Sequence, residues 1–420
     1  MSLAATQAEL EPRALAARPG PDPRVVGPAL LLLGGGAAAI GAAFGWRLAA
    51  LYLLGGSLGL VLYHASFGFA SSWRQFLVEG RGAGLRAQMV MLALATAIFL
   101  PVLAGGSLFG QSVGGAVAPV GVSVLVGALL FGLGMQLGGG CASGTLYTVG
   151  GGSTRMVVTL VFFVVGSLLG SAHLPWWLDQ PSLGSISLSR SLGLAPALTL
   201  QLGLFALLAL ATVAWERRRH GTLDHGVVVG LKAGGLHNGD QGWRRLLQGP
   251  WPLLWGAVLL ALLNVATLAL AGHPWTVSFG YTLWGAKAAA AVGIDVAAWD
   301  FWTWRFPSRA LAGSVFENST SVMNFGILVG AFLAAGLAGK FAPQRRVDLG
   351  PALAAVAGGL LMGYGARLAF GCNVGAYFSG IASGSLHGWL WFASALVGTY
   401  AGAKLRPLFG LEPIKAARGC

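Results

Sequence analysis

The chain has 420 residues, of which 55% are apolar and only 9% are charged, and its mean hydropathy is +0.72. Soluble globular domains carry about 25% charged residues, so this composition excludes that class and indicates a polytopic membrane protein. The net charge of +13 is assigned to loops that face anionic lipid, and no nucleic-acid partner is expected.

Apolar runs of about 20 residues recur along the chain, which favours spanning helices over the short alternating strands of a barrel. Residues 1–24 mix charges with prolines and are expected to form a disordered cytoplasmic tail without a signal peptide. Ten spanning helices are predicted at residues 25–45, 48–69, 86–105, 118–139, 155–172, 194–214, 250–271, 321–340, 350–370 and 386–404. The predicted fold class is therefore an all-α polytopic membrane protein.

A basic linker at residues 216–249 divides the predicted helices into two membrane halves, 25–215 with its core at 48–172, and 250–405. Residues 406–420 form a second tail. The linker carries Arg217, Arg218, Arg219, Arg244 and Arg245 and is therefore expected to be cytoplasmic. Counting helices outward places both termini in the cytoplasm, so a multi-pass protein of the bacterial inner membrane is predicted.

A cysteine motif occurs twice in the chain. Residues 127–147 read GALLFGLGMQLGGGCASGTLY and residues 358–378 read GGLLMGYGARLAFGCNVGAYF, and they align without a gap. Two of the three cysteines, Cys141 and Cys372, occupy the same place in this repeat, whereas Cys420 ends a polar tail and is expected to be inert. The match indicates chemistry at sulfur in a duplicated scaffold.

The repeat is predicted to be inverted. Ser66-Phe67-Gly68-Phe69 recurs as Ser278-Phe279-Gly280-Tyr281, and each copy precedes one cysteine motif. Under the charge bias, however, corresponding helices cross the membrane in opposite directions. Inverted repeats are typical of transporters with a substrate path at the repeat interface. Cys141 is then expected toward the cytoplasm and Cys372 toward the opposite face.

Each cysteine lies where the helical pattern breaks at glycines, among them Gly140 and Gly371. A broken helix is tolerated in a membrane only where it is buried in protein or lines an aqueous path. Neutral donors follow the cysteines, namely Ser143 and Thr145 in one copy and Asn373 in the other. Such groups can hold an anion without trapping it.

Plainer interpretations stand beside these. A buried cysteine is often only a small apolar residue, and glycines at four-residue spacing let membrane helices pack closely. Arg367 lies within an apolar span, and both anion attraction and snorkelling are left open for it. Ser66 and Ser278 complete the candidate pathway residues. No metal or cofactor is expected, because no Cys-x-x-Cys pattern, histidine cluster or ATP-binding loop is evident.

The two cysteine motifs and the Ser-Phe-Gly-Phe stretch followed by Trp73-Arg74 closely resemble the YeeE/YedE family of sulfur-compound transporters, over residues 48–172 and 275–405. The resemblance implies import of thiosulfate or a related sulfur anion, with Cys141 and Cys372 as S–H hydrogen-bond donors along the path. The family's first cysteine is expected directly after Phe69, where this chain has Ala70.

Two alternatives remain open at this point. The first is a membrane-embedded sulfurtransferase, in which a cysteine carries a persulfide to a cytoplasmic acceptor; that chemistry needs an activated thiolate at an accessible face. The second keeps the transporter and changes the cargo to a selenium compound, sulfite or a persulfide. The leading prediction is a transporter and not an enzyme, with the lipid membrane, a sulfur anion and a cytoplasmic sulfurtransferase considered as partners.

Overall fold

The computed structural model describes residues 20–224, 239–343 and 346–411. Most of the predicted N-terminal tail, the centre of the linker and the C-terminal tail with Cys420 lie outside these residues. Before residue 225 the elements are α1 (Pro23–Phe44), α2 (Trp46–His64), α3 (Phe69–Arg74), the π-helix η1 (Gln75–Glu79), α4 (Ala83–Gly105), β1 (Ser107–Leu108), β2 (Gln111–Ser112), β3 (Pro119–Gly121), α5 (Val122–Gly138), α6 (Ala142–Gly150), α7 (Thr154–Leu178), β4 (Ser182–Ser185), α8 (Leu188–Leu192) and α9 (Leu194–His220).

After residue 238 the elements are α11 (Gly239–Gln248), α12 (Leu253–Ala271), α13 (Ser278–Ala291), the short helix η3 (Val296–Ala298), α14 (Asp300–Thr303), α15 (Arg305–Ala312), η4 (Val315–Glu317), α16 (Ser319–Leu337), α17 (Leu349–Leu368), the π-helix η5 (Asn373–Phe378), α18 (Ser379–Ala382), α19 (Leu386–Leu405) and η6 (Arg406–Phe409). Within the described residues, nine stretches of helix are long and apolar enough to cross a membrane. The tenth predicted span forms α19, which has a spanning length but a less apolar sequence. The all-α polytopic fold is therefore confirmed.

Four predicted spans differ clearly from the structure at one end. The spans expected to end at residues 172 and 214 continue to Leu178 in α7 and to His220 in α9. The span expected to start at residue 118 begins only at Val122, because Pro119 and Gly121 disfavour helix and instead form β3, which pairs with β4. The span expected to run to residue 69 ends at His64, and Ser66 adopts the left-handed region with φ of 46°. This break turns the chain into the short helix α3.

The inverted repeat is visible in the contact between α5 and α17. A Cβ atom added at Gly127 would lie 2.7 Å from the carbonyl oxygen of Gly365, and one added at Gly134 would lie 2.8 Å from that of Gly358. As residue numbers rise along α5, its partners on α17 therefore fall, so the two helices are antiparallel. The four glycines occupy matching repeat positions, and exchanging the repeats maps one contact onto the other.

Exchanging the two repeats also maps the contacts of the flanking helices onto one another. Gly132 of α5 lies against the backbone of Ala395 on α19, and the matching Gly363 of α17 lies against the backbone of Phe163 on α7. The α2–α16 contact likewise corresponds to the α12–α4 contact. Glycines let these backbones approach closely, as expected for small residues at membrane helix interfaces. Corresponding helices thus run in opposite directions around one quasi-twofold axis.

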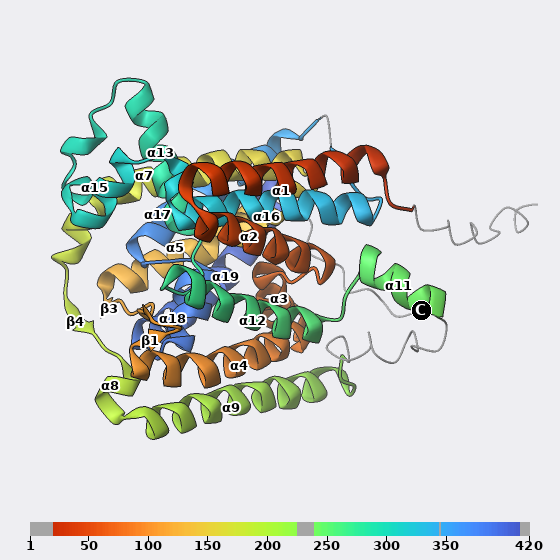
Figure 1. Cartoon of the computed structure of the whole chain (residues 1–420). Coiled ribbons are helices and arrows are strands. Elements are labelled where there is room, and N and C mark those ends of the chain that lie inside the picture. The colour runs from red at the N-terminus through yellow and green to blue at the C-terminus, as the bar shows by residue number, and fades with distance from the viewer. Residues whose placement is uncertain (1–19, 225–238, 344–345, 412–420) are drawn as a thin grey trace, which may run out of the picture.

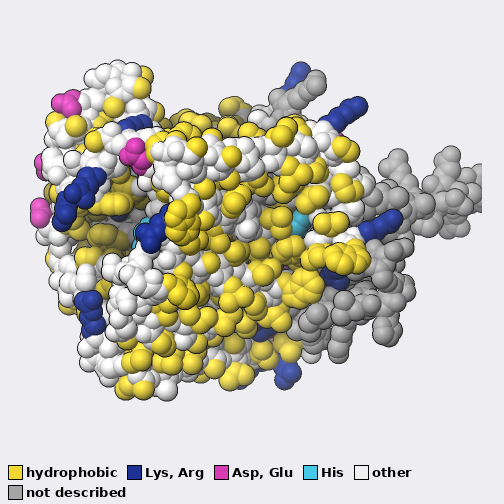
Figure 2. All heavy atoms as spheres, viewed as in Figure 1, with side chains coloured by type: hydrophobic (Ala, Val, Ile, Leu, Met, Phe, Trp, Pro, Cys, Tyr) yellow, Lys and Arg dark blue, Asp and Glu magenta, His cyan; other side chains and the backbone are white. Residues whose placement is uncertain are grey.

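The molecule has two distinct ends (Figure 1). At the first, which we call the linker end, α9 stops and α11 leads into α12; the second, which we call the loop end, carries β3, β4, α14 and α15. α1 and α9 run along opposite sides of the bundle, with α5 and α19 between them. In Figure 2 hydrophobic side chains cover most of the face between the two ends, which suits contact with lipid.

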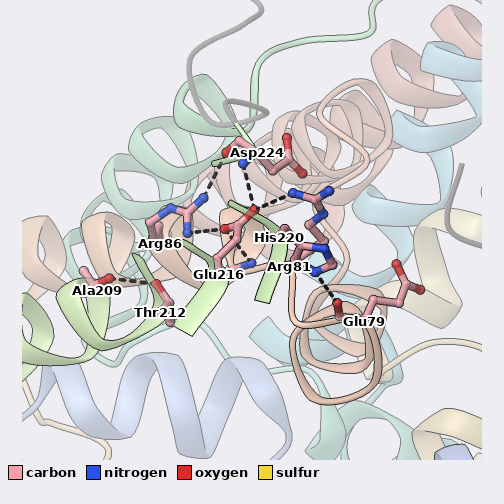
Figure 3. Close-up of polar contacts among 9 residues, drawn as sticks. Glu79, Arg81, Arg86, Ala209, Thr212, Glu216, His220 and Asp224 are labelled. Atoms are coloured by element: carbon pink, nitrogen blue, oxygen red, sulfur yellow. Dashed lines mark hydrogen bonds and ion pairs between the residues drawn. The ribbon is translucent and has the colours of Figure 1, made fainter. Parts of the chain in front are cut away.

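A buried carboxylate fixes α9 at the linker end (Figure 3). Glu216 is fully buried and pairs with Arg81 at 3.2 Å and with Arg86 at 2.7 Å. Its oxygens also accept hydrogen bonds from the backbone nitrogens of Gly82, at 3.2 Å, and Asp224, at 2.7 Å. A buried charge is tolerated only with such complete pairing, so this cluster anchors the start of the linker to the turn before α4.

Candidate functional site

The first break in the helices is built around Cys141. α5 ends at Gly138, and Gly139 takes the left-handed conformation with φ of 94°, which turns the chain into α6. Cys141 is the N-cap of α6, and its Sγ accepts a hydrogen bond from Gly144 N at 3.4 Å. The Cys141 Sγ also lies 3.5 Å from the Ser143 hydroxyl. This thiol is therefore held at the positive end of a helix inside the membrane region.

Ser143 and Thr145 lie with Cys141, as the sequence predicts. Both side chains are fully buried, and the Thr145 hydroxyl donates to the carbonyl oxygen of Cys141 at 2.9 Å. Thr145 thereby stabilises the break itself, whereas Ser143 faces the sulfur. Gly140, also buried, directly precedes the cysteine.

The second break is built around Cys372. α17 ends at Leu368, Phe370 adopts a left-handed φ of 56°, and Gly371 follows it. Cys372 then caps the π-helix η5, and its carbonyl oxygen accepts from Ala376 N at 2.9 Å. Short π-helical segments often mark functional sites. The thiol of Cys372 is completely buried.

Asn373 is the most unusual polar group at this break. Its side chain is fully buried, yet neither its Nδ2 nor its Oδ1 has a hydrogen-bond partner within the described residues. Buried amide groups are nearly always paired, and leaving one unpaired costs roughly 1–3 kcal/mol. An amide that remains unpaired beside Cys372 is therefore suited to contact a substrate or a water.

The two cysteines and Tyr281 form one buried centre. Cys141, Cys372 and Tyr281 belong to the same cluster of buried residues, and α6, which Cys141 caps, contacts η5, which Cys372 caps. The Tyr281 hydroxyl donates to the carbonyl oxygen of Ala142 at 2.9 Å, which ties α13 to the first break. Both thiols are enclosed deep within the bundle. That the two cysteines lie toward opposite faces of the membrane stays a prediction.

Tyr281 was not among the predicted site residues, although it lies in the repeated Ser-Phe-Gly motif. The matching residue in the first copy is Phe69, so the hydroxyl breaks the repeat. That difference between the copies is the only signal that the sequence carries for it. The Tyr281 side chain is fully buried and packs edge-on to Phe163 at 4.7 Å between ring centroids.

The two serines of this motif have different environments. Ser66 is exposed at the linker end, whereas Ser278 is buried and its carbonyl oxygen accepts from the Thr282 hydroxyl at 3.2 Å. Ser66 can therefore meet solvent directly, and Ser278 cannot. The backbones of the two positions differ as well, since Ser66 has a left-handed φ of 46° before α3, whereas Ser278 is the first residue of α13.

The two serines that follow Ala70 have no free hydroxyl proton. Ser71 and Ser72 both donate to the carbonyl oxygen of Gly68, at 3.1 and 2.7 Å, so their protons are already used. The carbonyl oxygen of Ala70 accepts from Gln136 Nε2 at 3.0 Å. Ser71 and Ser72 thus stabilise the turn into α3 and do not replace the donor that the family resemblance expects there.

Arg367 does not join the cysteine centre. Its guanidinium lies over the ring of Phe301 at 5.0 Å, and Phe301 belongs to a separate buried cluster near the loop end. Gln136, which takes the same repeat position on α5, instead accepts from Arg74 Nη1 at 3.1 Å. The cation–π contact holds the guanidinium, while Arg367 Nε is buried without a hydrogen-bond partner among the described residues.

Two arginines bind the C-terminal end of α5. Arg155 donates to the carbonyl oxygen of Leu137 at 2.6 Å, and Arg406 donates to that of Gln136 at 2.7 Å. Cations commonly bind the last carbonyl groups of a helix in this way. The sequence does not reveal this contact of Arg155, because the helix end that it caps is brought to it by tertiary contacts.

Comparisons with known proteins bear directly on this arrangement. The chain is 27% identical over 351 residues to the thiosulfate transporter TsuA of Spirochaeta thermophila, covering 80% of this chain and 92% of that protein. It is 24% identical over 360 residues to TsuA of Escherichia coli, covering 84% of this chain and 93% of that protein.

A shorter match joins the chain to the probable transporter YedE of Escherichia coli, with 30% identity over 170 residues, or 39% of this chain. The match spans 40% of that relative, and the equivalent match to YedE of Salmonella typhimurium spans 42%. The family model described as sulphur transport matches residues 64–401, which include both cysteine breaks. The protein therefore belongs to the sulphur transport family, as its resemblance to YeeE/YedE proteins predicts.

Proposed function

We propose that this protein imports thiosulfate or a closely related inorganic sulfur anion, which passes the buried centre formed by Cys141, Cys372 and Asn373. The observation that carries the proposal is the unpaired amide of Asn373 beside the buried thiol of Cys372, at the interface of two inverted repeats. The relatives named as thiosulfate transporters support the choice of cargo.

The chemistry of the centre suits a soft anion. A thiol donates only a weak hydrogen bond, so each contact releases the ion readily, as conduction through several sites requires. The N-terminus of α6, which Cys141 caps, adds a favourable dipole for negative charge. Ser143 and Asn373 supply stronger neutral donors on either side of the two sulfurs.

The proposed direction is inward across a bacterial inner membrane, with the linker end in the cytoplasm. Basic residues at the end of α9, namely Arg217, Arg218 and Arg219, support this orientation. A cytoplasmic sulfurtransferase that receives the anion at this end is part of the same proposal. The cargo leaves chemically unchanged, so the protein acts as a carrier and not as an enzyme.

The test is uptake of ³⁵S-labelled thiosulfate into proteoliposomes, with Cys141→Ala and Cys372→Ala compared with the parent protein. Cys420→Ala is the matched control because it removes the remaining cysteine, which has no part in the proposed path. Both centre variants should lower the initial rate at least about tenfold, as expected when a hydrogen bond of about 1.5 kcal/mol to a charged group is lost. Parental rates in both would refute the cysteine path.

The same preparation separates the proposal from its rivals. Competition by sulfite, selenite and sulfate identifies the cargo, because the true substrate competes at the lowest concentration. Mass spectrometry of Cys141 and Cys372 during turnover tests for a persulfide. A stable persulfide on either residue would favour a sulfurtransferase and contradict simple passage.

A further inference from the structure

A cavity of about 230 Å³ opens at the linker end. Its walls combine both repeats and the end of the linker: Tyr63, His64 and Ser66 at the end of α2, Tyr147 on α6, Lys340 after α16, and Pro250 before α12. One bound water needs about 10–15 Å³ of such space, so the cavity can hold a small ion together with water.

His64 is the buried polar group of this cavity. Only 2% of its surface is exposed, and its Nε2 has no hydrogen-bond partner among the described residues. The ring is held in place because the His64 carbonyl oxygen accepts from Trp251 N at 2.7 Å and the imidazole packs on Trp251 at 5.2 Å. Because buried polar atoms are nearly always paired, the unpaired nitrogen of a side chain that lines a cavity points to a ligand.

The charge of the cavity favours an anion. Lys340 brings an exposed ammonium group, while Tyr63, Ser66 and Tyr147 bring hydroxyls. Among the residues that the structure describes, those lining the cavity include no Asp or Glu. A compact oxyanion with several acceptor oxygens matches this set of donors better than a cation or an apolar molecule does.

One short helix joins the cavity to the first cysteine. Tyr147, which lines the cavity, belongs to α6, and Cys141 is the N-cap of that helix. Its hydroxyl is near Gly68, since a Cβ atom added at that glycine would lie 3.7 Å from it. Tyr147 thus places a hydroxyl in the region where Ala70 offers none.

We propose that this cavity is an oxyanion-binding vestibule, lined by His64, Ser66, Tyr147 and Lys340, and that it is the last site of the path at the linker end. The identity of the ion as a sulfur oxyanion rests on the proposed function. The proposal that the vestibule binds a small tetrahedral oxyanion does not rest on the proposed function.

The first experiment measures binding without transport. Ser66→Cys in the full-length Cys420→Ala protein places a reactive thiol at the exposed rim, while Cys141 and Cys372 stay protected by burial. Its labelling by a membrane-impermeant maleimide is followed with sulfate or thiosulfate present and with chloride at equal ionic strength. A soluble thiol labelled in parallel corrects for any reagent that thiosulfate consumes.

Sulfate and thiosulfate should slow this labelling at least about threefold. Lys340→Gln should raise the anion concentration that gives half protection about five- to tenfold, as expected for one exposed charge facing a dianion. Lys340→Arg should keep the protection. The matched control is Lys287→Gln, because Lys287 Nζ donates to Gly313 O at 2.7 Å and takes no part in the cavity. If sulfate and thiosulfate slowed the labelling no more than chloride does, the proposal of an oxyanion-binding vestibule would be wrong.

The second experiment measures uptake into proteoliposomes as a function of anion concentration. Lys340→Gln should change the half-saturating concentration and leave the maximal rate within about twofold, whereas a merely structural role would lower the amount of active protein instead. Unchanged saturation in Lys340→Gln would count against the vestibule as part of the path. If the anions protect the thiol introduced at the rim but the parent protein takes up no thiosulfate, the vestibule proposal is supported and the proposed function is refuted.

Discussion

Replacing Asn373 should make the protein more stable and less active at once. In Asn373→Leu, an apolar side chain of similar size replaces an amide whose two polar atoms are buried and unpaired. Each such atom costs roughly 1–3 kcal/mol, and a water bound there would reduce the gain to the lower part of that range. We therefore expect a rise in the apparent melting temperature of about 2–5 °C.

The matched control for this prediction is Asn264→Leu. Asn264 is as deeply buried, but its Nδ2 donates to Ser379 Oγ at 3.1 Å and its Oδ1 accepts from Trp275 N at 2.8 Å. Removing it leaves the Trp275 amide without that partner, so the melting temperature should fall by a few degrees. The comparison separates the loss of a paired amide from the loss of an unpaired one.

Melting is measured by tryptophan fluorescence in detergent and activity by ³⁵S-thiosulfate uptake. Asn373→Leu should lower uptake about tenfold or more, because a hydrogen bond to a charged substrate is worth about 1.5–3 kcal/mol. Added thiosulfate should raise the melting temperature of the parent but not of this variant. If Asn373→Leu melts at a lower temperature than the parent, as is expected for Asn264→Leu, or transports thiosulfate normally, Asn373 is not an unpaired substrate contact.

Three further substitutions follow from the packing. Gly363→Ala should lower stability by about 1–3 kcal/mol, since its Cβ would overlap the backbone of Phe163, whereas Gly203→Ala on α9 meets no atom and should be neutral or stabilising in the same melting assay. Glu216→Gln should cost about 3–5 kcal/mol, visible as easier proteolysis at the linker end. Arg367→Met should keep thiosulfate uptake within about twofold, because its guanidinium contacts Phe301.

Each of these has a result that contradicts it. Equal melting of the two glycine variants would show that the close approach at Gly363 is not tight. Unchanged proteolysis of Glu216→Gln would mean that Arg81 and Arg86 hold α9 without it. A tenfold loss of uptake in Arg367→Met, with normal melting, would return this arginine to the substrate path.

Much of the fold follows from sequence because it depends on local features. Long apolar runs predict the spanning helices, and the doubled glycine and cysteine motif predicts two matched halves, since the same contacts must form twice. The break at Ser66 and the strand at Pro119 were missed, because hydropathy does not distinguish a helix from an extended apolar segment of a few residues.

The site was harder to predict than the fold. Cys141, Ser143 and Thr145 are neighbours in sequence, so their proximity needs no tertiary information. The position of Tyr281 beside both cysteines depends on how α13 packs across the first break, which no local pattern encodes. The direction of Arg367 depends in the same way on the rotation of α17 against α7.

The antiparallel contact of α5 with α17 also bears on the energetics of conformational change. Exchanging the conformations of the two repeats about this contact would produce nearly the same molecule turned upside down. For an ideally symmetric sequence, two conformations related by this exchange would then have equal free energy. A preference for one of them would have to arise where the copies differ, as at Phe69 and Tyr281 or at Gln136 and Arg367. Substitutions at such unmatched pairs would shift the balance between the two conformations.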